Sequence, residues 1–131
     1  MTATTTSTHL ISSVFDAFKR GDIAYILAQV APGAIWRQSS TLPWGGDYSG
    51  PEGAGEFFQK LDATMVTTSF EIHENVEHDD EVFSFGSYGA KSRKTGKVAN
   101  AEWMFRWRVQ DGKIVFWQSY IDTALLLAAL E

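Results

Sequence analysis

The sequence predicts an α+β domain in which helices precede an antiparallel sheet. Two amphipathic patterns with helical spacing come first, and a third helix is expected from residue 51. From residue 67 onward, four segments alternate apolar and polar residues as strands do, and Asp- and Gly-rich turns separate them. Helices followed by consecutive hairpin-linked strands are typical of α+β proteins.

The first helix is expected to begin at Ser7 or Thr8, because either side chain can accept a hydrogen bond from the free N–H groups of a first turn. Its apolar residues recur three and four positions apart, and Gly21 ends it. Asp22 caps a second helix, whose apolar residues continue to Val30 before a Pro-Gly pair stops it.

A strand is expected over residues 34–40, with Trp36 and Gln38 on one face. The loop that follows, residues 41–50, contains Gly and Pro together with large apolar side chains, which usually fold back over the protein. Pro51 suits the first turn of the third helix, because that position needs no N–H donor.

The four strands of the meander are expected over residues 67–78, 81–94, 98–109 and 113–121. Asp-Asp, Thr-Gly-Lys and Asp-Gly sequences between them favour turns. Asp122 then caps a short C-terminal helix of Ala and Leu.

Composition limits the function. The 131 residues include no cysteine, which excludes a disulfide framework, a thiol nucleophile and thiolate metal sites. The net charge of −5 disfavours nucleic-acid binding, because phosphate contacts need clustered Lys and Arg. Neither a membrane span nor a secretory signal is recognisable. We therefore expect a cytoplasmic protein with a flexible tail at residues 1–8 and one domain at residues 9–131.

Strict alternation over residues 67–78 places Phe70 and Asn75 on opposite faces of the strand. His73 and His78 are five residues apart and therefore also point to opposite faces, which argues against a shared metal ion. The sequence contains no phosphate-binding loop and no nicotinamide or flavin fingerprint. We expect neither a metal nor a cofactor.

Three short motifs carry a family resemblance. They are Phe15 followed by Arg-Gly-Asp up to residue 22, Tyr-Ser-Gly-Pro-Glu-Gly at residues 48–53, and Gln-Asp-Gly-Lys-Ile with Tyr-Ile-Asp-Thr within residues 110–123. With the order of elements, they resemble the SnoaL-like branch of the nuclear-transport-factor-2-like superfamily over about residues 9–130. The resemblance implies a cone, in which a strongly curved sheet wraps around helices and leaves a pocket at its open end. It also implies a homodimer joined through the outer face of the sheet.

The resemblance also directs the search for catalytic groups. Ketosteroid isomerases of this superfamily place an Asp at the position of Gln38 and an oxyanion-hole Tyr at about Val14. Gln38 cannot take a proton at neutral pH and Val14 cannot donate a hydrogen bond, so these groups are absent. SnoaL-type cyclases rely on an Asp near the end of the last strand, which Asp122 matches best. Asp122 is therefore the candidate proton-transfer residue, and helix capping is its alternative role.

Aromatic residues form the candidate ligand site. Five tryptophans in 131 residues are many for core filling alone, because each indole N–H needs a partner. We expect these rings to line a pocket for a small hydrophobic molecule, and a solid core is the alternative. Tyr88 is a further hydrogen-bonding candidate. The predicted ligand-binding residues are Trp36, Gln38, Trp44, Tyr48, Trp103, Phe105, Trp107, Trp117 and Ser119.

The hairpin at Asp111 decides which way Ser119 faces. A two-residue turn pairs Trp107 with Phe116 and turns Ser119 away from the Trp face. A three-residue loop with a Gly bulge shifts the pairing and brings Trp117 and Ser119 inside. The residue pattern leaves both open, and the family resemblance favours the bulged loop.

That register leaves an aromatic and basic set on the outer face of the sheet, of the kind enriched in protein interfaces. We expect a homodimer through this face, with a solvated face as the alternative. The residues concerned are Met104, Arg106, Arg108, Phe116 and Tyr120.

Two functional hypotheses follow. In the first, a SnoaL-like protein binds a small hydrophobic molecule and carries out cofactor-free acid–base chemistry such as cyclisation, isomerisation or hydration. In this hypothesis, Asp122 transfers the proton, and Gln38, Tyr48 and Ser119 orient the substrate. In the second, the protein is a non-catalytic ligand-binding or dimeric assembly module.

Overall fold

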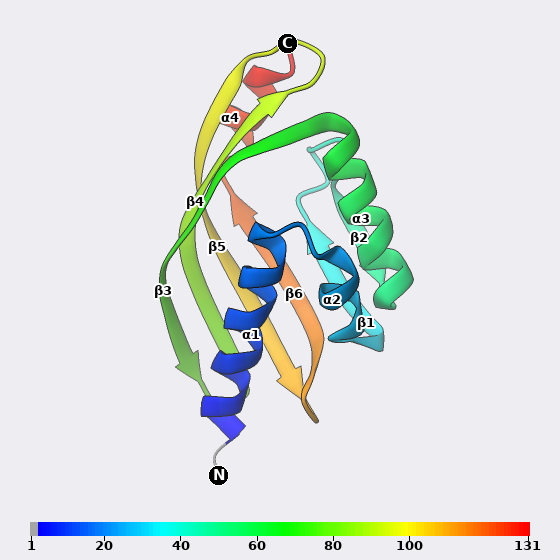
Figure 1. Cartoon of the computed structure of the whole chain (residues 1–131), viewed down its shortest axis with the longest axis vertical. Helices are drawn as coiled ribbons and strands as arrows, with labels where there is room; N and C mark the ends of the chain where they lie inside the picture. Colours follow the sequence, from blue (N-terminus) through cyan, green and yellow to red (C-terminus); the bar gives the residue numbers. More distant parts are fainter. Residues whose placement is uncertain (1–2) are drawn as a thin grey trace.

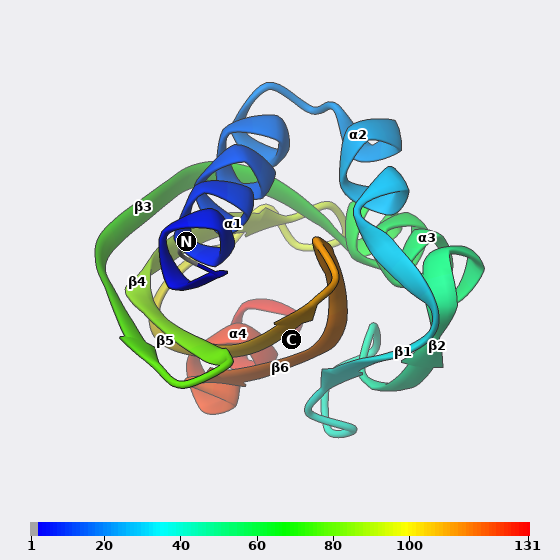
Figure 2. The same cartoon turned by 90° about the horizontal axis from the view of Figure 1, so that it is seen from below.

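The predicted α+β class is confirmed by helices that lie against a six-stranded sheet (Figure 1). The structure is a computed structural model and describes residues 3–131. Seen from below, the sheet curves around α1 and does not close, which gives the predicted cone (Figure 2). The helices are α1 (Ala3–Lys19), α2 (Ile23–Ala28), α3 (Gly50–Thr64) and α4 (Thr123–Ala129), and the strands are β1 (Val30–Gln38), β2 (Gly46–Ser49), β3 (Met65–His78), β4 (Glu81–Ser92), β5 (Val98–Gln110) and β6 (Lys113–Ile121).

The strand order is β2-β1-β6-β5-β4-β3, and β1 with β6 is the single parallel pair in this sheet of the described chain. Strands β3 to β6 form the predicted meander. Strand β1 comes from the helical half of the chain and joins the last strand. The inward faces of β1 and β6 are therefore turned toward the helices together with those of β3 to β5.

Two boundaries in the helical half differ from prediction. Helix α1 already includes residues 3–8, whereas residues 1–2 of the predicted tail lie outside the described residues. A helix nucleated by its amphipathic part can extend through residues of moderate helix propensity such as Thr. Helix α2 ends at Ala28, and Val30 instead opens β1, where it is buried and pairs with Ile114. No helix among residues 3–131 is long and apolar enough to cross a membrane.

Both predicted Asp caps are present. The carboxylate of Asp22 accepts a hydrogen bond from the backbone N–H of Tyr25 at 3.1 Å. Asp122 accepts one from the backbone N–H of Leu125 at 3.4 Å, at the start of α4. The loop between β1 and α3 also folds back as expected, because Leu42 and Trp44 are buried and β2 pairs with β1.

The hairpin between β5 and β6 reaches the predicted register by a different geometry. Asp111 and Gly112 both have positive φ, and they form a two-residue turn flanked by the pair Gln110 and Lys113. A bulge then leaves Val115 without a partner in β5. Trp107 consequently pairs with Trp117, and Ser119 is buried, as predicted. The predicted three-residue loop is wrong, because the extra residue lies within β6 rather than in the turn.

The predicted strict alternation of β3 is wrong, because this strand contains a bulge. The register shifts between Ile72 and Glu74, so that His73 is the extra residue. As a result Asn75 lies opposite Ser84 on the inner side of the sheet, together with Phe70. Bulges increase local twist and bend a strand, which suits a sheet that curves this strongly.

Gly86 in β4 permits close packing against the neighbouring strands. It pairs with Trp103 in β5, and the Trp103 indole ring lies directly over it. A Cβ atom at Gly86 would overlap both this ring and the backbone carbonyl oxygen of Glu71. A residue with any side chain therefore forces a shift of backbone as well as of the ring.

We predict that Gly86→Ala lowers the free energy of unfolding by about 1–3 kcal/mol, which is the usual cost of overpacking. Urea denaturation followed by Trp fluorescence measures the change. The half-exposed neighbour Ser87 provides the control Ser87→Ala, for which we expect a change within about 0.5 kcal/mol. Equal losses for the two variants would contradict this account of Gly86.

Candidate functional site

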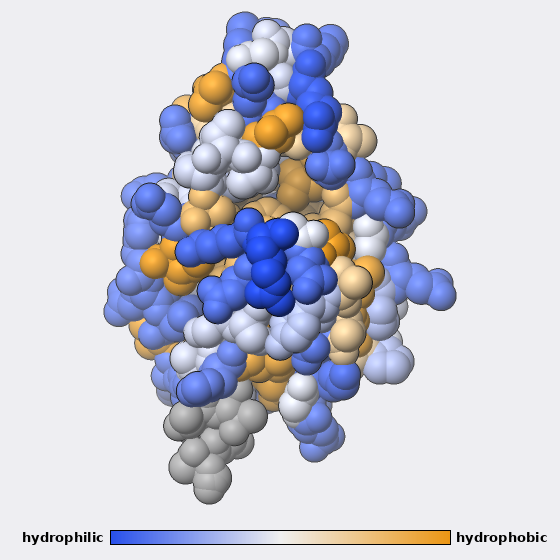
Figure 3. Space-filling view, in the orientation of Figure 1, coloured by the Kyte–Doolittle hydropathy of each residue, from blue (hydrophilic) through white to orange (hydrophobic). Residues whose placement is uncertain are grey.

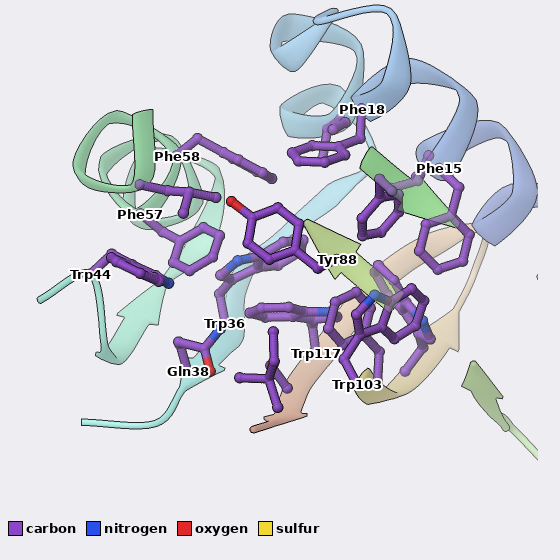
Figure 4. Close-up of a pocket in the computed structure, with 18 of the residues that line it drawn as sticks. Phe15, Phe18, Trp36, Gln38, Trp44, Phe57, Phe58, Tyr88, Trp103 and Trp117 are labelled. Carbon is purple, nitrogen blue, oxygen red and sulfur yellow. The ribbon is translucent and has the colours of Figure 1, made fainter. Parts of the chain in front are cut away.

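A cavity of about 70 Å³ lies between the inner face of the sheet and helices α1, α2 and α3. Its walls are almost entirely apolar or aromatic, and apart from the indole N–H groups the polar side chains of its described lining are those of Gln38, Tyr88 and Ser119. Figure 4 shows rings from α1 and α3 on one side and rings from the sheet on the other. Leu126 of α4 closes part of the wall. The site is therefore an aromatic cavity at the centre of the cone.

The sheet brings together most of the predicted ligand-binding residues. Alternation along β1, β5 and β6 turns every second residue inward, so residues far apart in the sequence share one surface. The pair Trp36 and Trp117 stacks with ring centroids 4.5 Å apart. The predicted residues that line the cavity are Trp36, Gln38, Trp44, Trp103, Phe105, Trp107, Trp117 and Ser119.

Tyr48 and Asp122 are placed elsewhere. Tyr48 is buried beside the cavity lining, and its hydroxyl donates to the carbonyl oxygens of Trp44 and Gly45, each at 3.1 Å. These two hydrogen bonds stabilise the loop that contains Trp44. Asp122 is exposed and caps α4, because β6 ends one residue before it and the chain turns there into the helix. Its position supports the capping role and does not place a carboxylate in the cavity.

Several lining residues were not predicted. Phe15 of α1 lies within 6 Å, ring centroid to centroid, of Phe70, Trp103 and Trp107, and so joins the helix to the sheet. The helical spacing of the apolar residues indicates that such side chains are buried. It does not indicate which of them border a cavity, since that depends on packing between elements. The added aromatic residues are Phe15, Phe18, Phe57, Phe58 and Phe70.

The indole N–H groups of the cavity residues differ in their hydrogen bonding. The Nε1–H of Trp107 donates to Ser84 Oγ at 3.1 Å, and Ser84 Oγ in turn donates to Asn75 Oδ1 at 2.6 Å. In contrast, the Nε1 atoms of three other tryptophans and Ser119 Oγ are buried and have no hydrogen-bond partner within residues 3–131. Buried polar groups without partners are rare and costly. The three tryptophans are Trp36, Trp103 and Trp117.

This difference predicts unequal effects of two matched substitutions at buried serines. Ser84→Ala removes the partner of both Trp107 and Asn75, and should lower the free energy of unfolding by about 1–3 kcal/mol. Ser119→Ala removes a hydroxyl that has no partner in the described chain, and should cost less than about 1 kcal/mol. Urea denaturation of the two variants tests the prediction. A larger loss for Ser119→Ala would show that its hydroxyl is hydrogen-bonded in solution.

Tyr88 is the one titratable group among the described residues that line the cavity. Burial raises the pKa of its phenol, and a hydrogen bond from Thr67 Oγ1, at 3.4 Å, offsets this only in part. The phenol is therefore neutral at pH 7 and can donate a hydrogen bond. Figure 4 shows the Tyr88 ring among the aromatic side chains of the cavity. The described lining contains no carboxylate or imidazole that could act as a general base. No cluster of metal-binding side chains occurs in residues 3–131.

The outer face of the sheet carries the predicted aromatic and basic set. The guanidinium groups of Arg37, Arg106 and Arg108 lie 5.5, 5.7 and 5.9 Å from the ring centroid of Phe116. Glu81 accepts hydrogen bonds from Arg106 at 2.8 Å and from Arg108 at 3.0 Å. Burial raises the pKa of Glu81, but these two guanidinium groups outweigh that effect and hold the pKa below its ordinary value.

Comparison with known proteins decides the family. Residues 11–117 match the family model described as a SnoaL-like domain, which is most of the chain. The chain belongs to the SnoaL-like family. This confirms the resemblance in the sequence motifs. No curated protein sequence matches this SnoaL-like protein.

Solved structures share the fold of the SnoaL-like protein. An NTF2-like protein from Burkholderia thailandensis E264 is 27% identical, with a TM-score of 0.88 over 94% of this chain and 95% of that one. TerC, co-crystallized with polyporic acid, is 22% identical, with a TM-score of 0.84 over 95% of this chain and 98% of that one. A putative polyketide cyclase from Xanthomonas campestris pv. campestris is 17% identical, with a TM-score of 0.79 over 99% of this chain and all of that one, 100%.

Proposed function

We propose that this SnoaL-like protein binds a small, flat, uncharged molecule in its aromatic cavity. The observation that carries the proposal is a space bordered by aromatic rings from seven helices and strands, with no charged side chain in its described lining. Flat rings stack favourably on such walls, whereas an ion would lose its hydration without gaining a partner. TerC, which shares the fold, was co-crystallized with polyporic acid.

The size of the cavity limits the ligand. A cavity needs about 10–15 Å³ to hold one water molecule, so a cavity of about 70 Å³ holds a few water molecules or a single ring. Pockets for drug-sized ligands usually measure about 300–1,000 Å³. A larger ligand must therefore displace side chains at the cavity wall.

Two surface hollows adjoin the cavity and show where such displacement is easiest. A groove of about 720 Å³ between α1, α3 and β3 shares Phe18, Phe58 and Phe70 with the cavity. Figure 3 shows apolar side chains at this hollow in the upper half of the view. A second cleft, of about 750 Å³, shares Gln38 and Ser119 with the cavity. We expect a ligand to enter the cavity across one of these two borders.

Binding is better supported than catalysis. Cyclisation, isomerisation and hydration each require a group that accepts a proton, and the described cavity lining provides only the neutral phenol of Tyr88. Asp122 is outside the cavity. Of the two hypotheses, the geometry therefore favours ligand binding without catalysis.

A cavity-filling substitution tests the proposal. Val14 of α1 borders the cavity, and Val14→Phe should fill much of the 70 Å³. We expect a one-ring hydrocarbon, α-methylstyrene, to bind the unmodified protein and to bind the variant at least about tenfold more weakly, because a ligand and the new ring cannot occupy the same space. Ligand-observed NMR and calorimetry measure the affinity.

The matched control is Val76→Phe, at a residue that is 41% exposed and does not border the cavity. This variant should bind α-methylstyrene as the unmodified protein does. Failure of the unmodified protein to bind, or equal binding by Val14→Phe, would overturn the proposed function.

We also propose that the outer face of the sheet joins two copies of the chain. Three exposed apolar side chains lie on it, since Ile35, Phe85 and Tyr120 are 40, 39 and 46% exposed. Its arginines are already paired with Glu81 and with Asp47, so the face carries both charges side by side. A surface of this kind is complementary to itself across a two-fold axis. A second copy is therefore the occupant that fits it.

Phe116 lies at the centre of this face, beneath three guanidinium groups. We predict that Phe116→Glu converts a dimer to a monomer, because a buried carboxylate there would disturb the existing ion pairs. Size-exclusion chromatography with light scattering reports the mass. Leu125→Glu, at a residue of α4 that is 47% exposed, is the control that should leave the dimer intact. A monomeric unmodified protein, or an unchanged mass for Phe116→Glu, would exclude this interface.

A further inference from the structure

Several hydrogen-bond donors on residues that border the cavity have no partner in the described chain. Trp36 and Trp117 are 2 and 3% exposed, and Ser119 is 5% exposed, yet the Nε1 atoms and the Oγ atom have no partner in residues 3–131. All three residues border the cavity. They belong to the adjacent strands β1 and β6, in which Trp36 pairs directly with Trp117.

The described chain supplies no hydrogen-bond partner for these donors. The carboxamide oxygen of Gln38 accepts from the backbone N–H of Ser39 at 2.9 Å, which leaves its N–H₂ group for other partners. The remaining neighbours of the stacked indoles are aromatic rings, including Phe57 and Phe105 at 5.3 and 5.1 Å from Trp117. The described cavity wall therefore has hydrogen-bond donors without partners, and it contains no carboxylate that could accept their hydrogen bonds.

Trp107 supports this interpretation by contrast. It borders the same cavity, but Ser84 accepts its N–H at 3.1 Å. The fold thus provides an acceptor for the indole N–H of Trp107 and provides none for those of Trp36, Trp103 and Trp117. A buried donor left without a partner destabilises the protein unless an acceptor from outside the chain satisfies it.

We infer that the ligand is an uncharged planar molecule that carries an acceptor oxygen, such as an aromatic ketone, and that one or two of the donors on Trp36, Trp117 and Ser119 determine this specificity by hydrogen bonding to that oxygen. The inference rests on the proposed function and names the chemical class of its ligand. A carboxylate would also accept these hydrogen bonds, but the described lining has no cation to balance its charge.

Three one-ring compounds of nearly equal shape test the inference. Acetophenone carries a carbonyl oxygen, α-methylstyrene replaces that oxygen by a methylene group, and benzoate adds a negative charge. We expect acetophenone to bind the unmodified protein about threefold to tenfold more tightly than α-methylstyrene, as one buried hydrogen bond provides. Benzoate should bind more weakly than both.

The indole N–H signals in ¹⁵N–¹H NMR spectra report the contact directly. Acetophenone should shift the signal of Trp36 or Trp117 downfield, and α-methylstyrene should not. The signal of Trp107 should stay in place, because Ser84 already accepts that proton. Since the spectra use the unmodified protein, this measurement does not depend on whether any variant folds.

Substitutions that keep an aromatic ring complete the test. Trp117→Phe removes the N–H and should abolish most of the preference for acetophenone, whereas Tyr25→Phe, which removes a hydroxyl group outside the cavity lining, should retain it. Equal affinities for acetophenone and α-methylstyrene with unmoved indole signals would overturn the inference and leave the proposed function standing. Tightest binding of benzoate would overturn it as well. Absence of binding by all three compounds would overturn the proposed function itself, and the inference with it.

Discussion

The bulge at Val115 fixes which side of β6 faces the helices, and most of the molecule depends on it. Because side chains alternate along a strand, a shift of one residue exchanges the entire inner and outer sets. With the bulge, Trp117 and Ser119 lie inside and Phe116 lies outside. The aromatic cavity and the mixed aromatic and basic outer face are therefore two results of one backbone irregularity.

Aromatic rings then hold the curved sheet and the helices together. Trp103 lies almost parallel to Phe105 of the same strand at 4.0 Å, and to Phe70 of β3, two strands away, at 5.2 Å. Phe15 extends this layer to α1. Large rigid rings bury much area with few rotamers, but they fill a tapering space imperfectly. A small cavity among them is the physical consequence.

The chemical character of that cavity follows from the same residues. Tryptophan brings an N–H donor with every ring, and the fold satisfies it for Trp107 and leaves it unsatisfied for Trp36 and Trp117. The site combines apolar walls with unpaired donors and lacks a general base in its described lining. This combination favours recognition of a neutral molecule over proton transfer.

The sequence by itself determined the order of elements, both Asp caps and the inward set of β1 and β5, because capping and alternation are local properties. It did not determine that Asp122 points away from the cavity or that Tyr48 fastens a loop, since both depend on where neighbouring elements lie. Only the tertiary structure decided which tryptophans find an acceptor. Ser84 reaches Trp107 across 23 residues of sequence, and a bulge in β3 that no periodic pattern reveals places Asn75 opposite Ser84.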